Sequence, residues 1–355
     1  MNRESVAGPQ AGRPHAAPLW TTRFRRNRSA VLGAALVLFL VAFAWLAPLL
    51  SSHDPMISDF TNGVRPDTGT PVGPSSAFWF GADRIFRDEF VRLAFGARLS
   101  LLIGVSATAI ASALGAAVGI VAGYNEGRSG FVIPWPLPIA LAGGLALAVG
   151  GHSTLAIVGS LFGIVISVVA IKSQIRFLTA GVDMNFDIAL MRLVDIGLSF
   201  PFLLLVMAVG SAVDRTSVGS ILLVLGLTGW LGTARLVRAK TMQIRSRDFI
   251  LAARGLGAGT TRILFRHILP NIAGPLIVVS TVSVAQMILA ESVLSYLGVG
   301  ISPPTPTWGH MLFEGQDYYA AAPWLVIAPG VAILIAVFGF NLLGEGLRDA
   351  LDPRE

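Results

Sequence analysis

The chain contains no cysteine and only two lysines among its 355 residues. Without cysteine it has no disulfide, no thiolate nucleophile and no cysteine metal site. The lysines, Lys172 and Lys240, do not follow a glycine, which excludes the phosphate-binding sequence Gly-x-x-x-x-Gly-Lys-Ser/Thr. Any ATP chemistry linked to this chain must therefore come from a partner protein.

Charged residues are also scarce. They make up 13% of the chain, whereas hydrophobic residues make up 54% and the mean hydropathy is +0.71. Soluble globular domains carry about 25% charged residues. The composition therefore indicates a polytopic membrane protein, and several apolar runs reach the roughly 20 residues that a transmembrane helix needs.

Histidine is limited to five residues in tails and loops. They are His15, His53, His152, His267 and His310. A membrane enzyme would need a nucleophile–base pair or a set of metal ligands at membrane depth. We therefore predict no catalytic residue and no metal site. His152 lies in a turn between two apolar runs, where we expect a solvated side chain rather than a ligand or proton site.

The net charge of +6 and the isoelectric point near 10.4 would suit a nucleic-acid-binding protein, but the positions of the basic residues favour another interpretation. They cluster beside apolar runs, as cytoplasmic loops of membrane proteins do. One cluster precedes the first apolar run, and the other lies in residues 238–269. Both regions, and with them both termini, are predicted to be cytoplasmic.

The first third of the chain divides into four segments. We predict a disordered cytoplasmic tail at 1–28, because it is rich in Pro, Gly and Ala, and an N-terminal transmembrane helix at 29–50. Residues 51–98 are predicted to be extracytoplasmic. Their second half, 83–98, has the apolar spacing of an amphipathic helix on the membrane surface. Residues 99–124 are the first core transmembrane helix, with glycines four residues apart that permit close packing.

Residues 125–187 hold two further apolar runs, at about 136–149 and 154–171. The first run is short and rich in proline, so it either spans with a tilt or is re-entrant. In both cases the pair returns the chain to the same side. The sequence does not indicate what this insertion does.

The remaining transmembrane core is predicted at 188–343, followed by a cytoplasmic tail at 344–355. Its first helix is expected to break at Pro201, and Arg192 and Asp195 lie three residues apart, a spacing that allows an ion pair. The later spans are predicted at 217–237, 272–299 and 323–343. Between the first two lies a short basic helix at 248–256, which Ser246 is expected to cap.

This basic helix belongs to the pattern AARGLGAG…RHILPN, which begins at Ala252 and ends at Asn271. The pattern resembles the EAA loop of ABC importer permeases, and specifically the C-type subunit of the dipeptide and oligopeptide permease family. In that family the loop is a coupling helix that docks in a groove on a cytoplasmic ATPase. One residue departs from the family, because Leu251 stands where Glu is usual. The resemblance implies coupling roles for Asp248, Leu251, Ala252, Ala253, Arg254, Gly257 and Pro270.

Three further stretches resemble the same family. Residues 81–98 resemble its GTDDLGRD…GAR segment, although Phe86 replaces a usual Gly, and residues 303–309 (PPTPTWG) resemble its PPTPSWG. The chain's last residues, 341–354, resemble its C-terminus. These likenesses imply an extracytoplasmic gate or a contact with a binding protein, with a solvated surface as the alternative for 83–98. The residues concerned are Asp83, Arg87, Asp88, Pro303, Pro304 and Trp308.

Polar residues along 280–291 are candidates for the transport pathway, namely Ser283, Gln286 and Glu291. An acidic residue at membrane depth is a functional hypothesis by default, as a proton relay or gate. However, the segment AESVLSYLGVG resembles the family's AEASLSFLGLG. In that setting, a hydrogen bond from Glu291 to a neighbouring helix end is the favoured alternative.

Together the resemblances imply a type I ABC importer permease. Such a subunit would have a core of five helices, to which this chain adds an N-terminal helix and an extra helical hairpin, for six to eight spans in the bacterial inner membrane. It would bind no cofactor directly, because ATP and magnesium would occupy two partner ATPase subunits. A B-type permease subunit and an extracytoplasmic binding protein would complete the importer.

The substrate is left open by the sequence. Di- and oligopeptides are the first expectation, and nickel chelates or glutathione are alternatives within the same family. A different class, a secondary ion-coupled transporter, usually carries ionisable residues near the midplane and repeated halves. Apart from Glu291 the apolar runs here have almost none, which favours the ATP-driven importer.

Overall fold

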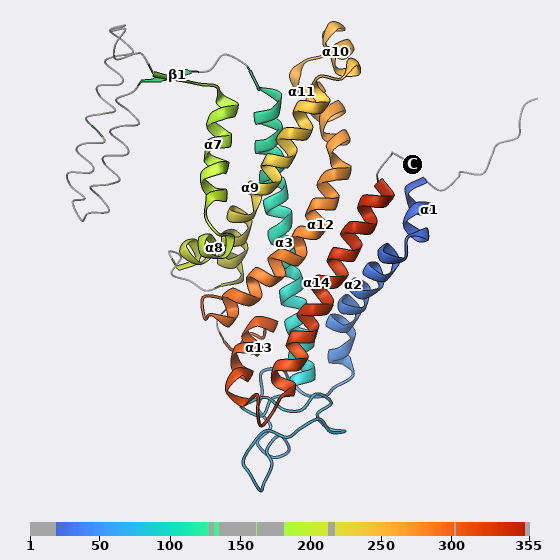
Figure 1. Ribbon diagram of the computed structural model, residues 1–355. Coiled ribbons are helices and arrows are strands. Elements are labelled where there is room, and N and C mark those ends of the chain that lie inside the picture. The colour runs from blue at the N-terminus through green and yellow to red at the C-terminus, as the bar shows by residue number, and fades with distance from the viewer. Residues whose placement is uncertain are drawn as a thin grey trace, which may run out of the picture. The chain divides into compact units, whose positions relative to one another are not determined.

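The computed structural model describes residues 19–127, 131–134, 161, 181–211, 217–301 and 303–351 (Figure 1). In this part of the chain, five helices are long and apolar enough to cross a membrane, and a broken pair would supply a sixth. The elements in chain order are α1 (Leu19–Arg26), α2 (Arg28–Leu46), the 3₁₀ helix η1 (Ala47–Leu49), α3 (Glu89–Tyr124), β1 (Phe131–Pro134), β2 (Gly181–Met184), α7 (Phe186–Ser199), α8 (Phe202–Ser211), α9 (Val218–Arg245), α10 (Asp248–Gly255), α11 (Thr260–Ile263), the π-helix η2 (Leu264–Ile268), α12 (Leu269–Tyr296), α13 (Trp308–Gly315), the 3₁₀ helix η3 (Gln316–Tyr318) and α14 (Trp324–Leu351).

The predicted all-α membrane fold is confirmed. The only strands among the described residues are β1 and β2, which pair antiparallel with Phe131 opposite Met184. They lie near the two ends of the predicted insertion at 125–187. The two apolar runs of that insertion lie outside the described residues.

The chain forms two compact units. The first comprises Met1–Leu114, Pro201–Thr233 and Leu269–Glu355, and the second comprises Gly115–Phe200 and Ala234–Ile268. Each unit is described separately below.

In the first unit, α14 packs along α2 (Figure 1). Two glycines permit this contact. A β-carbon on Gly33 would collide with the backbone of Leu343, and one on Gly346 would collide with Ala30. Since lipid offers no hydrophobic drive for two helices to associate, close backbone approach of this kind is what holds them together.

Two apolar clusters form the core of the first unit. One joins α2, α3, α12, α13 and α14 around Ile288 and the fully buried Trp308. The other joins α3, α8, α9 and α12 around Ile103 and Leu225. Helix α3 contributes to both clusters.

Two predictions about the first 98 residues are wrong. Residues 83–98 do not form a separate surface helix, because α3 begins at Glu89 and continues unbroken to Tyr124. Its first turns are buried, and Arg92 in them forms ion pairs inside the protein with Asp83 and Glu314. Within the tail predicted to be disordered, Leu19–Arg26 instead forms α1, and Asn27 after it donates a hydrogen bond of 2.7 Å to Asp349. The tail's first 18 residues lie outside the described part.

The helix predicted near 188–210 is interrupted where the sequence suggested. Helix α7 ends at Ser199 and α8 begins at Phe202, immediately after Pro201, whose preceding residue is extended as proline requires. The predicted pair of Arg192 with Asp195 is wrong. Asp195 instead binds the guanidinium of Arg235 on α9, which reaches it from a neighbouring helix rather than along its own.

Candidate coupling loop and buried outer cluster

In the second unit, α10 forms a short helix beyond the end of α9. Arg247 at its start is extended, and Asp248 occupies the first turn, where the helix dipole favours a negative charge. The predicted cap is wrong, because the Ser246 hydroxyl donates to the carbonyl of Gln243 in the last turn of α9. No side chain caps α10, so its first N–H groups remain available to solvent or a partner.

Most of the coupling residues predicted on α10 are exposed. Asp248, Leu251, Ala252 and Arg254 are exposed, and Ala253 is half-buried. Leu251 is 53% exposed and Leu256, just after the helix, is 89% exposed. An apolar tip of this kind beside arginines suits a protein groove better than water. Pro270 is the second residue of α12, as predicted for a residue with no N–H to donate.

Gly257 makes the turn that follows α10. Its φ of +80° lies in the left-handed region that glycine adopts readily, and its N–H donates to the carbonyl of Arg254. A β-carbon placed there would meet no atom within 4 Å. The position is therefore open on the outside and constrained only in its backbone.

Arg245, at the end of α9, holds the end of α3. Its Nη1 donates to the carbonyls of Tyr124 and Glu126 at 2.9 Å each, and its Nη2 lies 3.3 Å from the Glu126 carboxylate. These carbonyls have no partner within their own helix, as at any helix end. One planar guanidinium thus satisfies both and fixes the two helix ends together.

Tyr124 links this joint to α10. The guanidinium of Arg254 lies 5.2 Å from the centre of the Tyr124 ring, and the Tyr124 hydroxyl donates to Thr260 at 3.5 Å. Further along α3, a β-carbon on Gly123 would lie 2.7 Å from the carbonyl of Arg238. The coupling segment is therefore attached to two helix ends rather than hanging as a loop. The sequence did not reveal this, since Tyr124 and Arg245 are 121 residues apart.

In the first unit, a second group of charged residues is buried near the start of α3. Arg87 binds Asp83 at 2.6 Å and Glu314 of α13 at 3.0 Å. Arg92, with no exposed surface, binds the same Glu314 at 2.5 Å and Asp83 at 3.3 Å. We call Asp83, Arg87, Arg92 and Glu314 the outer cluster. Its two positive and two negative charges balance, so burial in the protein is tolerated.

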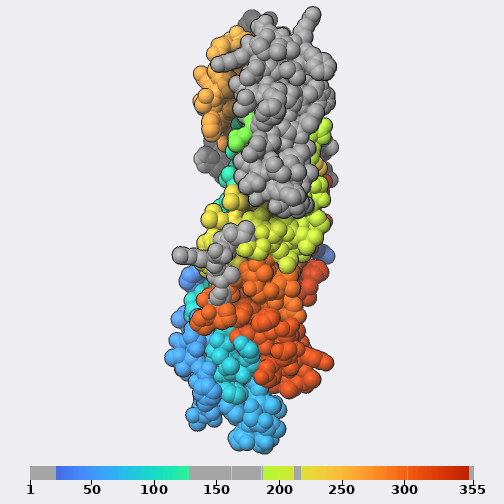
Figure 2. Space-filling model, turned by 90° about the vertical axis from the view of Figure 1, so that its left-hand side faces the viewer, coloured from blue at the N-terminus to red at the C-terminus, as the bar shows by residue number. Residues whose placement is uncertain are grey.

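The outer cluster joins the loop before α3 to α13, which meet at one end of this unit (Figure 2). Arg92 and Glu314 were missed at the sequence level. A signal existed, because Glu314 lies in the segment 301–322, which has no lysine or arginine to pair with. Residues so far apart in the sequence can be recognised as partners only in the folded chain.

Most of the residues predicted for the gate or the binding-protein contact are buried within the chain. Asp83, Arg87, Asp88 and Trp308 are each at most 3% exposed, so their side chains are not presented at its surface. Asp88 instead binds His53 at 2.8 Å and Ser51 at 3.1 Å. Of the residues expected at this surface, only Pro303 and Pro304 are exposed.

Phe86 stands where the family's segment usually has Gly, and its backbone conformation shows how the chain accommodates this change. It is the only non-glycine residue with a positive φ, +70°, among the described residues. Glycine adopts this conformation without strain, whereas a residue with a β-carbon does not. Phe86 therefore adopts a backbone conformation that suits the usual glycine. Its ring packs edge-on against Phe60, with the ring centres 5.5 Å apart.

Among the pathway candidates, Glu291 is fully buried. It accepts hydrogen bonds from Ser100 on α3 at 3.0 Å and from Ser295 at 2.8 Å. This favours the alternative in which Glu291 bonds to a neighbouring helix. Ser283 is half-buried and Gln286 is exposed on α12, so these two remain candidates for a pathway completed by another subunit.

We predict that Glu314→Ala destabilises the protein strongly. It leaves Arg87 and Arg92 buried, with Asp83 as the one acid among the described residues that still forms an ion pair with them, and removing one partner from a buried ion pair costs about 3–5 kcal/mol. The free energy of unfolding, measured by titration with dodecyl sulfate, should fall by that order. Glu345→Ala, at an exposed position on α14, is the matched control. A loss below about 1 kcal/mol for Glu314→Ala, as is usual for a surface ion pair, would contradict the argument.

The same cluster predicts a dependence on pH. Burial raises the pKa of Glu314, but His310, Arg92 and Arg87 more than offset this and bring the pKa to about 2, below the usual 4.5. A lowered pKa in the folded state means that the ionised form stabilises the fold. This stabilisation is complete above pH 4.5 and is lost as the pH falls towards 2. The thermal midpoint should therefore drop over this range, and less steeply in Glu314→Gln. Equal slopes in both proteins would contradict the assignment.

The fold is that of a multi-pass membrane protein. One unit carries an exposed loop that is attached to two helix ends, and the other carries the outer cluster, whose buried charges pair with one another. The model for the family of binding-protein-dependent transport system inner membrane components matches residues 178–355, about half of the chain. The model for the N-terminal transmembrane domain of oligopeptide transport permease C matches residues 19–65. The chain belongs to the family of binding-protein-dependent transport system inner membrane components.

Several relatives match almost the whole chain. The oligopeptide transport system permease protein OppC of Bacillus subtilis (strain 168) is 31% identical over 332 residues, which cover 94% of this chain and 88% of the relative. The dipeptide transport system permease protein DppC of Alkalihalophilus pseudofirmus is 31% identical over 357 residues, covering 100% and 96%. The di/tripeptide transport system permease protein DppC of Pseudomonas aeruginosa is 32% identical over 354 residues, covering 100% and 97%.

Proposed function

We propose that this chain is a permease subunit of an ATP-driven importer of di- and oligopeptides, and that α10 is its coupling helix. The observation that carries the proposal is the exposed face of α10 and its turn, with Leu251 and Leu256 presented beside arginines on an anchored base. Its relatives are peptide permeases by name, which supports peptides as the substrate class. Nickel chelates and glutathione are the alternatives that a transport assay separates.

The partners follow from what the chain lacks. With no phosphate-binding loop of its own, it would use two ATPase subunits that hold ATP and magnesium. A second permease subunit would complete the pathway, and a binding protein would deliver substrate from outside. The positive charge of the loop at 238–269 supports a cytoplasmic position for α10 and for both termini. The outer cluster then lies on the extracytoplasmic side of the inner membrane.

In this mechanism α10 transmits a displacement. Closure of the ATPase dimer on ATP would push α10, and Arg245 and Tyr124 would pass that movement to the ends of α9 and α3. Helices of this length move as bodies, because their apolar faces are packed against neighbours. Mechanical coupling of this kind needs no catalytic residue in this chain.

The absence of cysteine permits a sharp test. In the complex purified with its partner subunits, a cysteine introduced as Leu256→Cys should form cross-links to an ATPase subunit through a short bifunctional maleimide. Asn62→Cys, exposed on the outer loop, is the matched control and should not. The same complex in proteoliposomes should take up labelled tripeptide only with ATP. Cross-linking of neither variant, or uptake without ATP, would refute the proposal.

A further inference from the structure

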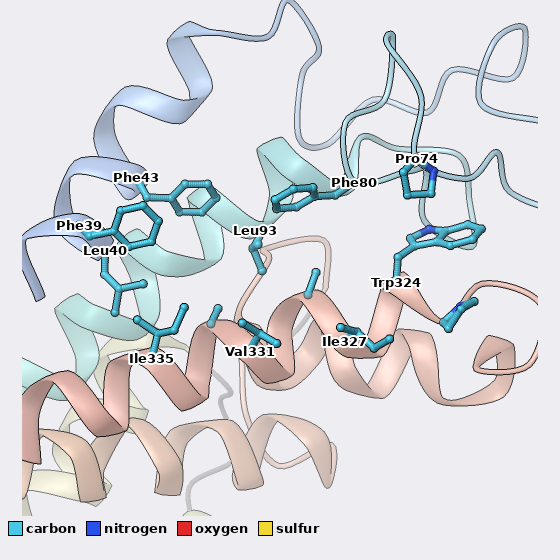
Figure 3. A pocket seen from close by; sticks show the side chains of 13 residues that line it. Phe39, Leu40, Phe43, Pro74, Phe80, Leu93, Trp324, Ile327, Val331 and Ile335 are labelled. Carbon is cyan, nitrogen blue, oxygen red and sulfur yellow. The ribbon is translucent and has the colours of Figure 1, made fainter. Parts of the chain in front are cut away.

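An apolar groove runs between α2 and α14 in the first unit (Figure 3). Its volume is about 460 Å³. Ile327, Val331 and Ile335 form a row along α14, and Figure 3 shows Phe39 and Leu40 of α2 at one end with Trp324 and Pro74 at the other. Ile327 is 61% exposed and Phe39 56%, so the groove opens to the outside of the chain.

The length of the groove matches one leaflet of a bilayer. From Trp324 to Ile335 the helix rises about 16 Å, at 1.5 Å per residue. Half of the hydrocarbon core of a bilayer is about 15 Å thick. The groove begins at a tryptophan, the residue type that gathers at the membrane interface, and contains only apolar side chains below it.

A cation lies at the tryptophan end. A β-carbon placed on Gly73 would lie 3.1 Å from Nη2 of Arg65 and 3.4 Å from Cη2 of Trp324, so the guanidinium and the indole flank the same residue. Pro74, the next residue, lines the groove. Arg65 is exposed, and the structure gives its guanidinium no ion pair with any acid of the described residues.

Trp324 is held firmly in this position. Its Nε1 donates to the carbonyl of Ala82 at 3.2 Å, so the indole's one polar group is satisfied away from the groove. A β-carbon on Gly81 would lie 2.5 Å from the same Nε1, which shows how closely the backbone approaches the ring. The indole of Trp324 at the rim of the groove is therefore held in one position by its contacts.

We propose that this groove binds a phospholipid of the outer leaflet, with one acyl chain along Ile327, Val331 and Ile335 and the phosphate on Arg65. Arginine recognises phosphate through paired N–H donors, which supplies the charge complementarity at the rim. The inference uses the orientation proposed above but not the identity of the transported substrate.

Photo-crosslinking tests this site in the purified complex. The probe is phosphatidylglycerol with a diazirine halfway along one acyl chain, added to the complex in dodecyl maltoside, a detergent without phosphate. Mass spectrometry of the irradiated protein should find adducts concentrated at Ile327 and Val331. Arg65→Gln should reduce that labelling roughly tenfold, as expected when a hydrogen bond to a charged group is lost. Val331→Trp, which fills the groove, should abolish it.

Matched controls separate the site from general contact with lipid. Arg348→Gln removes an exposed arginine elsewhere, and Leu334→Trp enlarges an exposed residue of α14 that does not line the groove. Both should label as the native chain does, and a diacylglycerol with the same photoactive chain should label about tenfold less. Equal labelling by the diacylglycerol or in Arg65→Gln would overturn the proposal. So would labelling spread evenly over Leu38, Leu334 and Phe338, or a groove that stays unlabelled because a protein segment covers it.

Discussion

Gly257→Asp should leave the protein in the membrane and reduce ATP-driven uptake to background. A β-carbon meets nothing within 4 Å at Gly257, so the new carboxylate would point outward into the groove of the proposed ATPase partner. The φ of +80° costs aspartate less than most residues, because Asp and Asn enter the left-handed region more readily. The measurement is tripeptide uptake into proteoliposomes, at equal amounts of folded complex.

Gly69→Asp is the matched control for this substitution. Gly69 has nearly the same φ, +66°, and equally empty surroundings, but lies in the segment predicted to be extracytoplasmic. The Gly69→Asp variant carries the same backbone strain and the same added charge, but away from the proposed ATPase contact. It should therefore transport normally. Gly257→Asn then separates charge from size. Full uptake by the Gly257→Asp variant would contradict the assignment of α10 as the coupling helix.

Arg245→Ala should uncouple ATP hydrolysis from transport. The ATPase partner would still bind the exposed face of α10, because that face is untouched. The two carbonyls that Arg245 holds at the end of α3 would be released, and with them the joint between that end and α9. Misplacement of about 1 Å is enough to cost 100-fold in other systems that depend on geometry. We expect ATP hydrolysis to be retained and uptake per ATP to fall at least about tenfold.

The control for Arg245→Ala is Arg192→Ala, on the exposed side of α7. It removes the same charge and stem without opening a helix joint, so the ratio of uptake to hydrolysis should stay at the native value. Arg245→Lys keeps the charge but not the planar pair of donors, and should recover only part of the coupling. If hydrolysis and uptake fell in parallel for Arg245→Ala, the residue would serve docking or stability rather than transmission.

Local patterns in the sequence predicted elements well. The long spans were located from apolar runs of about 20 residues, and the break at Pro201 followed from the restraint that proline places on its neighbour. Each of these features depends on residues within a few positions of one another, which is why composition and spacing were enough.

Features that depend on distant residues were not predicted. The sequence predicted Asp83 and Arg87 on a surface helix, at a gate or binding-protein contact or on a solvated face. Both are buried, and Arg87 binds Glu314, 227 residues away. The spacing of Arg192 and Asp195 allowed an ion pair, whereas Arg235 on another helix binds Asp195. In both cases a partner came from a segment whose proximity no local pattern records.

The amino-acid order by itself determined that this chain crosses a membrane several times, that its basic residues cluster beside apolar runs and that it carries no Gly-x-x-x-x-Gly-Lys-Ser/Thr sequence. Run length, charge and residue type carry that information, because partition between lipid and water acts on each segment separately. Only the tertiary structure decided what each polar side chain does. Arg92 balances a buried charge, Arg245 joins two helices and Arg65 stands at the rim of a groove, and these three arginines differ in role because they differ in what surrounds them.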